Sequence, residues 1–209
     1  FAAPTRANDP VFFFKQKISW ERPRRPKRTK RYIWKYYLIF SIIIFSTPFD
    51  ESAVALLEDL ASPMYKIASF EMTDLNLVSA VAKTGKPTII STGMANMEEI
   101  AETVDAFKCH SNAQLVLLHC VSAYPSPADA YNLNCIKSMA SAFGLPVGLS
   151  DHTDSNVAAI VAAALGANVF EKHFIIDRSL GGPDSSFSIE PEQLRNYITD
   201  INTAYYSLG

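Results

Sequence analysis

The sequence predicts an α/β fold that forms part of a TIM (β/α)8 barrel, and three observations carry this prediction. From residue 38 onward, short apolar runs alternate with amphipathic stretches. The units recur at intervals of about 22–32 residues, which is typical of repeated βα units around a parallel sheet. Every apolar run ends in polar or reactive residues. A barrel gathers such residues at the carboxyl ends of all its strands, whereas an open sheet concentrates them at one switch point.

The individual elements follow from residue patterns. Apolar runs bounded by turn residues predict six strands, at residues 38–46, 64–69, 87–92, 114–122, 146–150 and 168–173. Apolar residues at helical spacing predict helices that include residues 97–107, 157–164 and 194–201. The expected N-caps are Asp50, Asp74, Asn96 and Ser155. The expected helix ends are Gly85, Gly144 and Gly166.

Composition places the chain among ordinary globular proteins. It has 209 residues, of which 48% are hydrophobic, and a formal net charge of -2. These values argue against a largely disordered chain and against a nucleic-acid partner. Three scattered cysteines do not form a disulfide framework, so we expect a reducing compartment and a cytoplasmic location.

The net charge conceals a division of the chain. Residues 1–35 carry a formal charge of +9 and the remainder carries −11. We therefore divide the chain into an atypical basic segment, residues 1–37, and a barrel domain, residues 38–209. The basic segment is expected to be disordered or not native coding sequence, and we expect no strand in it.

The apolar run that follows the basic segment has three interpretations. The basic residues before residues 36–46 are typical of a membrane anchor. However, the run is shorter than the roughly 18–20 residues that a spanning helix needs. A buried strand is therefore favoured over an anchor, and membrane association is not expected. A frame artefact at the start of the chain remains the third interpretation.

Two histidines follow successive predicted strands and are candidate metal ligands. His152 and His173 lie at strand ends joined by one helix, and neighbouring parallel strands are about 4.8 Å apart. Two imidazoles, completed by oxygens of substrate or water, suit a divalent transition metal. The alternative is that each histidine packs locally.

A lysine within an apolar strand indicates an anion site. Lys66 interrupts residues 64–68, and a buried charge is costly unless it meets an opposite charge. Serines at nearby strand ends would help it to hold a phosphate or carboxylate; these are Ser69, Ser91 and Ser150. Alternatively, the lysine amine reaches solvent or an acid. Acids at the same rim, which could shuttle protons or accept hydroxyls, are Glu71, Glu171 and Asp184.

Six segments in one order resemble the sialic acid synthase family. They are Ser46-Thr47-Pro48-Phe49-Asp50, Tyr65-Lys66-Ile67-Ala68-Ser69-Phe70-Glu71, Ser91-Thr92-Gly93-Met94-Ala95, Ser122-Ala123-Tyr124-Pro125, Gly148-Leu149-Ser150-Asp151-His152-Thr153 and Glu171-Lys172-His173-Phe174. The resemblance covers residues 45–208. Within the family, Phe70 and residues 182–188 look most like the branch that makes pseudaminic acid.

The resemblance implies both fold and reaction. The family fold is a (β/α)8 barrel followed by a small antifreeze-like domain, and a homodimer completes the site. The six predicted strands then correspond to the last six βα units. The implied activity is a transferase reaction that condenses phosphoenolpyruvate with an N-acetylated amino sugar, forming a carbon–carbon bond and releasing phosphate.

The resemblance also assigns residues. His152 and His173 match the ligands of a divalent metal, expected to be Mn, Mg or Co. The positions that match the phosphoenolpyruvate site are Thr47, Lys66, Ser69, Ser91 and Ser150. The positions that match residues facing the sugar or reacting centre, expected to be catalytic, are Glu71, Tyr124 and Asp184.

The chain departs from the family pattern in two places. No counterpart is expected in residues 1–37 for the first two barrel strands, and none is expected in this sequence for the antifreeze-like domain. We therefore expect a fragment with impaired activity and apolar strand edges exposed between its first and last strands. Two alternatives to the synthase remain: a non-catalytic, membrane-tethered barrel remnant, and another phosphoenolpyruvate-using or aldolase-type barrel enzyme.

Overall fold

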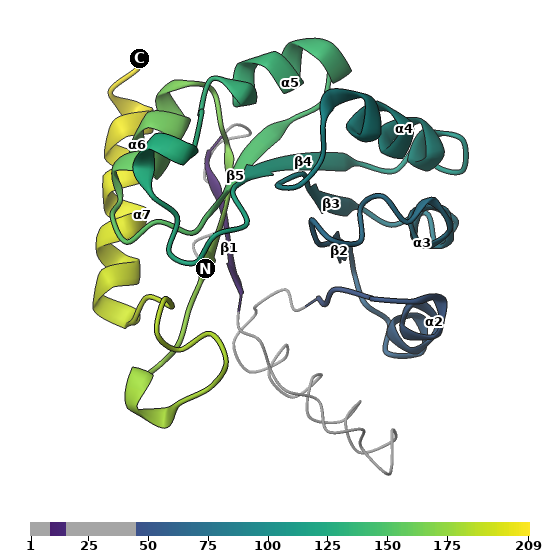
Figure 1. Cartoon of the computed structure of the whole chain (residues 1–209), viewed down its shortest axis with the longest axis horizontal. Coiled ribbons are helices and arrows are strands. Elements are labelled where there is room, and N and C mark those ends of the chain that lie inside the picture. Colours follow the sequence, from purple (N-terminus) through teal and green to yellow (C-terminus); the bar gives the residue numbers. More distant parts are fainter. Residues whose placement is uncertain (1–8, 16–44) are drawn as a thin grey trace.

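The computed structural model describes residues 9–15 and 45–209, and within them a single six-stranded parallel sheet forms the scaffold. The strand order is β1-β6-β5-β4-β3-β2. The sheet curls into a half-barrel with the helices outside it, which confirms the partial TIM barrel (Figure 1).

The elements alternate along the chain. The strands are β1 (Val11–Lys15), β2 (Tyr65–Ile67), β3 (Thr88–Ser91), β4 (Leu115–Cys120), β5 (Val147–Asp151) and β6 (Val169–His173). The α-helices are α2 (Glu51–Asp59), α3 (Leu75–Ala82), α4 (Met97–Lys108), α5 (Cys135–Phe143), α6 (Val157–Ala164) and α7 (Pro191–Tyr206). Two 3₁₀ turns, η1 (Ala128–Ala130) and η2 (Arg178–Leu180), lie in the connections.

Five of the six predicted strands are confirmed, as β2 to β6. The remaining predicted strand, residues 38–46, lies mostly outside the described residues. Its last residue, Ser46, forms a parallel bridge with Tyr65, so the chain enters the described region alongside β2. The division of the chain at residue 37 stays a prediction.

The expectation of no strand before residue 38 is wrong. β1 pairs in parallel along the whole of β6, from Val11 opposite Val169 to Lys15 opposite His173. The apolar run of β1 is short and surrounded by basic residues, and its stability comes from pairing and packing rather than from a local pattern. Because β1 covers the edge of β6, the expected exposure of that edge is wrong, although the sheet of the described residues is still open, with β1 and β2 as its outer strands.

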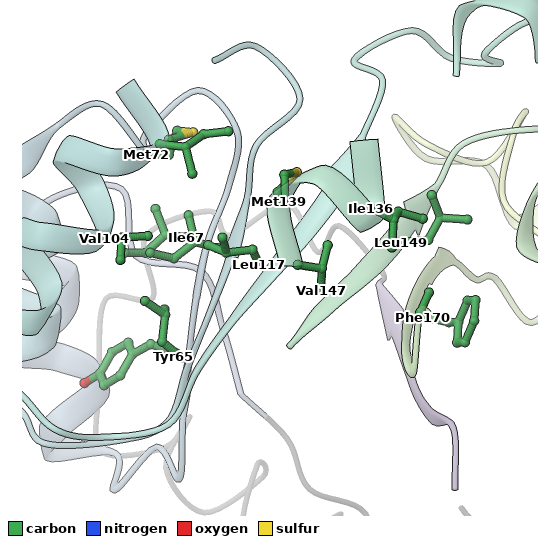
Figure 2. Packing of buried hydrophobic residues seen from close by; sticks show 14 of the residues in the cluster. Tyr65, Ile67, Met72, Val104, Leu117, Ile136, Met139, Val147, Leu149 and Phe170 are labelled. Carbon is green, nitrogen blue, oxygen red and sulfur yellow. The ribbon is translucent and has the colours of Figure 1, made fainter. Parts of the chain in front are cut away.

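Side chains on the two faces of the sheet form two apolar clusters. The larger one lies between the sheet and the helices and includes Ile67, Leu117 and Leu149 (Figure 2). The smaller cluster, here called the inner cluster, is centred on Ile89, Leu118 and Val169, with partly buried side chains around it. These alternate faces follow from the two-residue period of a strand.

A close approach of strands requires glycine on the inner face. A Cβ on Gly148 would overlap the carbonyl oxygen of Val169 and lie 2.8 Å from Leu118 Cδ2. Residue 148 therefore has to be glycine for β5 and β6 to pair at this level.

Three of the four predicted N-caps are confirmed. Asp50, Asp74 and Asn96 accept hydrogen bonds from the first turns of α2, α3 and α4. Ser155 is not the cap of α6, because that helix begins after Asn156. The Asn156 side chain instead donates a 2.7 Å hydrogen bond to Asp200 of α7, which joins the two helices.

Within residues 9–15 and 45–209, no helix has both the length and the apolar character needed to cross a bilayer. The proposed anchor, residues 36–46, falls almost entirely outside this range.

Candidate active site

The predicted site residues on the strands share the inner face of the sheet, beyond the inner cluster. Cys120 is opposite Ser150 in the β4–β5 register, and Ser150 is opposite Glu171 in the β5–β6 register. Lys66 of β2 is opposite Ile89, two residues before Ser91. The inner face is thus apolar at one end and polar at the carboxyl ends of its strands.

A buried lysine and its partners form the first half of the site, here called the lysine cluster (Lys66, Ser91, Ser150 and Glu171). Lys66 is only 4% exposed, and its Nζ donates a 2.6 Å hydrogen bond to Ser91 Oγ. Nζ also lies 3.5 Å from Glu171 Oε2. Ser150 Oγ donates to Glu171 Oε1 at 2.7 Å. A cation and two hydroxyls thus line one wall, with a carboxylate between them.

Aromatic rings and an acid form the second half, here called the imidazole cluster (Tyr124, His152, His173, Asp184 and Phe187). The rings of His152 and His173 have centroids 5.4 Å apart. The Tyr124 ring lies 4.2 Å from that of His152 and 5.6 Å from that of His173. Asp184 Oδ2 lies 3.4 Å from His173 Nδ1. The structure therefore brings the two predicted metal ligands together with two of the predicted catalytic residues.

Hydrogen bonding fixes the orientation of the His152 ring. Its Nδ1 lies 2.7 Å from the carbonyl oxygen of Val121, which can only accept, so Nδ1 carries the proton. In the neutral ring the lone pair is then on Nε2, which lies 3.3 Å from Ser150 Oγ. Ser150 Oγ therefore contacts both Glu171 Oε1 and His152 Nε2.

This donor set fits a divalent metal in part. A ligating histidine typically donates its second ring nitrogen to a carbonyl, as His152 does. Two nitrogen donors at this spacing suit a transition metal that completes its coordination with oxygens. In the part of the chain that the structure describes, no group of three or more His, Cys, Asp or Glu side chains is arranged to hold an ion. Any further ligands would therefore come from solvent, substrate or elsewhere.

The tyrosine beside the histidines is held in its protonated form. Burial, with the nearby charges of Cys120, Glu171 and Asp184, raises the pKa of Tyr124 to about 12. At neutral pH its hydroxyl therefore remains a hydrogen-bond donor. Tyr124 is 42% exposed, so part of the residue is accessible to solvent.

Residues 22–209 match the pattern of the NeuB family. The chain belongs to the NeuB family of sialic acid synthases. It is 43% identical to the pseudaminic acid synthase of Helicobacter pylori over 166 residues, which is 79% of this chain and 49% of that protein. It is 31% identical to the human N-acetylneuraminate-9-phosphate synthase over 86% of this chain and 50% of that protein.

Solved structures support the family and the fold. The N-acetylneuraminic acid synthetase of Leptospira borgpetersenii, solved with citrate, superposes with a TM-score of 0.83 at 33% identity, over 88% of this chain and 64% of that one. A phospho-2-dehydro-3-deoxyheptonate aldolase of Thermotoga maritima superposes with a TM-score of 0.76 at 13% identity, over 94% and 60%, which shows a shared fold alone. The chain spans about half the length of the curated relatives it matches.

Ser69 lies close to the lysine cluster in this NeuB-family chain. Its Oγ accepts a 3.1 Å hydrogen bond from Gly93 N and lies 3.1 Å from Cys120 Sγ. A Cβ on Gly93 would lie 2.5 Å from that sulfur, so the glycine allows the loop after β3 to approach β4. The buried thiol has a raised pKa because burial disfavours its thiolate.

Glu71 follows β2, and Thr47 lies at the start of that strand. Glu71 Oε2 is buried, and no hydrogen bond satisfies it within the described residues. An unsatisfied carboxylate oxygen is costly and is a frequent feature of a group that meets a ligand. Thr47 is half-buried and directly follows the Ser46 bridge to β2. The structure does not bring either residue into the lysine or imidazole cluster.

Two members of the site were missed or underrated by the sequence interpretation. Glu171 was expected only as one of several rim acids, yet it contacts both Lys66 and Ser150. The two-residue period of β6, which places Glu171 on the face of His173, is the signal that could have found it. Phe187 packs 5.0 Å from the rings of both Tyr124 and His173, and no local pattern in its loop predicts this.

Proposed function

We propose that this chain carries the phosphoenolpyruvate and metal sites of a nonulosonic acid synthase, with pseudaminic acid as the proposed product. The reaction would join phosphoenolpyruvate to an open-chain N-acetylated amino sugar and release phosphate. The observation that carries the proposal is the position of the lysine cluster directly beside the imidazole cluster, linked through Ser150 and His152. The names and identities of the family relatives support it.

The lysine cluster supplies the anion site in this proposal. Phosphoenolpyruvate is strongly anionic, and Lys66 with the Ser91 and Ser150 hydroxyls offers charge-assisted hydrogen bonds in a buried setting. Glu171 holds both Lys66 and Ser150 at this face. It therefore keeps the cation and a hydroxyl oriented before the substrate arrives. Ser69, beside Cys120 and Gly93, would extend the site, and Thr47 would contribute from the start of β2.

The imidazole cluster supplies the metal site and faces the sugar. His152 and His173 would hold a divalent ion, expected to be Mn, Mg or Co, and such an ion polarises a bound aldehyde as a Lewis acid. Tyr124, kept protonated, would donate to a substrate oxygen. Asp184 would orient His173 through its 3.4 Å contact, and the unsatisfied Glu71 oxygen would accept a substrate hydroxyl.

Replacing the lysine tests the anion site. Lys66→Met keeps the length and apolar stem of the side chain but removes the charge that pairs with the phosphate or carboxylate. We expect phosphoenolpyruvate affinity, measured by calorimetry on the full chain, to fall about 10- to 100-fold, since a charged hydrogen bond contributes roughly 1.5–3 kcal/mol. Lys86→Met is the matched control, because Lys86 pairs with Glu58 near the surface. Equal affinity of Lys66→Met and wild type would contradict the assignment.

Product analysis tests the reaction class. Phosphate and a nonulosonic acid should appear together when phosphoenolpyruvate and an N-acetylated amino sugar are supplied. A different condensation product would favour another phosphoenolpyruvate-using barrel enzyme. The homodimer, the cytoplasmic location and the impaired activity of this stretch alone stay predictions, and phosphate release at a rate typical of the family would contradict the last of them.

A further inference from the structure

A buried polar cluster lies directly behind the two candidate metal ligands, on the outer face of β5 and β6. Its members, here called the supporting cluster, are Tyr131, Asp151, Thr153, Lys172 and Tyr197. Asp151 and Lys172 are opposite each other in the β5–β6 register, and each immediately precedes one of the two histidines. None of these five residues has a part in the reaction proposed above.

An ion pair forms the centre of the supporting cluster. Lys172 Nζ lies 2.9 Å from Asp151 Oδ2 and donates a 2.6 Å hydrogen bond to the carbonyl oxygen of Thr153. The same ammonium lies 5.3 Å from the centre of the Tyr197 ring of α7. Asp151 is fully buried and Lys172 is 3% exposed. A pair buried this deeply is weak evidence for a contribution to stability, because desolvation of both charges offsets their attraction.

The remaining bonds of the cluster converge on the backbone of His152. Asp151 Oδ1 accepts a 2.8 Å hydrogen bond from Thr153 N, and it shares the Thr153 hydroxyl proton, also at 2.8 Å, with the carbonyl oxygen of Ser155. It also accepts from the Tyr131 hydroxyl at 3.5 Å. That hydroxyl in turn accepts a 2.6 Å hydrogen bond from His152 N. The backbone on both sides of His152 is thus tied to one carboxylate.

The supporting cluster therefore fixes the backbone positions of the two histidines. The Val121 carbonyl fixes the His152 ring, and the supporting cluster fixes the backbone from which that ring extends. Through Lys172 it also joins the strand end of His152 to that of His173. Two side chains that bind one ion must be held to within about 0.5 Å, and residues behind the ligands typically provide this.

We propose that Tyr131, Asp151 and Lys172 are positioning residues that hold the imidazoles of His152 and His173 at the separation required for a shared divalent cation. This inference rests on the proposed function, since it takes the two histidines as ligands. Tyr131 is the link that can be removed with least disturbance, because phenylalanine differs from it by one hydroxyl.

The test compares Mn²⁺ binding to the full chain and its variants, measured by the loss of the electron paramagnetic resonance signal of the free ion. Tyr131→Phe leaves the His152 N–H without its acceptor, and we expect Mn²⁺ affinity to fall about 10-fold or more, with the number of sites unchanged. Tyr65→Phe is the matched control. Tyr65 is also buried, and its hydroxyl donates to the carboxylate of Glu58. It lies at the amino end of β2, whereas both histidines lie at the carboxyl ends of their strands. The control should bind Mn²⁺ as the wild type does.

Further variants separate this inference from the metal assignment. His152→Ala should abolish binding; if it binds Mn²⁺ as the wild type does, the metal assignment fails, and the inference fails with it. If His152→Ala loses binding while Tyr131→Phe retains wild-type affinity, the inference alone is overturned. Should Tyr131→Phe not fold, Thr153→Val, which removes one hydroxyl donor to Asp151, replaces it with the same expected direction. Urea unfolding of every variant establishes folding, and weakened binding in Tyr65→Phe at equal stability would overturn the inference.

Discussion

Side-chain direction along β6 explains how adjacent residues take different tasks. Glu171 faces the inner side and holds Lys66, whereas Lys172 faces outward and holds Asp151. Neither lysine is exposed, so each buried cation is paired with a carboxylate on a neighbouring or nearby strand. Consecutive residues of β6 thus form one ion pair on each face of the sheet, and these pairs fix the strand ends that carry the histidines.

The predicted locations of site residues agree with the structure where chain position alone determines them, and the roles of these residues stay predictions. The site residues at strand ends, such as Ser91, Ser150 and His173, lie together because parallel strands end at one edge. Lys66 was expected to meet an anion or an acid, and the structure places Glu171 beside it. Tyr131 could not be found this way, because its hydroxyl reaches His152 from a connection whose path depends on tertiary packing.

A histidine outside the site gives a pH-dependent prediction. Burial lowers the pKa of His119 from its ordinary 6.5, more than its 2.6 Å hydrogen bond to the Tyr131 carbonyl raises it. The unfolded chain therefore takes up this proton at a higher pH than the folded chain. The contribution of neutral His119 to the free energy of unfolding is fully present above pH 6.5. It is lost as pH falls below that value and through the folded-state pKa.

His119→Gln should remove the pH-dependent contribution of His119 to stability while keeping a side-chain hydrogen-bond donor. The stability difference between about pH 7 and about pH 5, measured by urea unfolding, should be smaller in the variant than in the wild type. Parallel pH curves for the two proteins would show that the His119 proton is not linked to folding.

Elements were predictable where the local pattern and the tertiary structure agree. The capping box of α4 can be found in the sequence, since Asn96 and Glu99 are spaced to satisfy each other's backbone donors, and the structure contains both bonds. β1 shows the opposite case. Five residues have too little periodicity to identify a strand, and long-range pairing with β6 decides their conformation.

The inner face of β5 gives a prediction at the scale of the element. Gly148→Ala places a methyl group against the Val169 carbonyl and the Leu118 side chain, so β5 and β6 must separate. We expect the free energy of unfolding to fall by about 1–3 kcal/mol or more, measured in urea. Gly85→Ala is the control, because nothing lies within 4 Å of its added Cβ and only its φ of 70° opposes the change. A smaller loss for residue 148 than for residue 85 would contradict the packing argument.

At the scale of the whole molecule, the two ends of the described chain are joined. The Tyr206 hydroxyl of α7 donates a 3.0 Å hydrogen bond to Asp9, just before β1. Phe13 of β1 packs edge-on against Phe45, at a centroid distance of 5.4 Å, and both belong to the inner cluster. β1 is therefore part of the half-barrel and not an appendage, which the charge division of the sequence had concealed.

This integration predicts the effect of a single change in β1. Phe13→Ala should lower the free energy of unfolding of the full chain by about 2 kcal/mol, since it removes a partly buried ring from the inner cluster. Phe49→Ala should change it by less than about 0.5 kcal/mol, because that ring is 64% exposed. If Phe13→Ala matches Phe49→Ala in urea unfolding, β1 does not contribute to the cooperative unit.

The alternation of faces in β5 and β6 also limits how this protein can vary in length. Inserting or deleting one residue within either strand would exchange its inner and outer side chains, so that Ser150 would trade places with Asp151, or Glu171 with Lys172. Members of the lysine cluster would then face the helices, and members of the supporting cluster would face the inner side of the half-barrel. Length variation among functional descendants of this sequence should therefore be confined to the connections, whereas within these ten residues only substitutions that respect the odd–even pattern can be inherited.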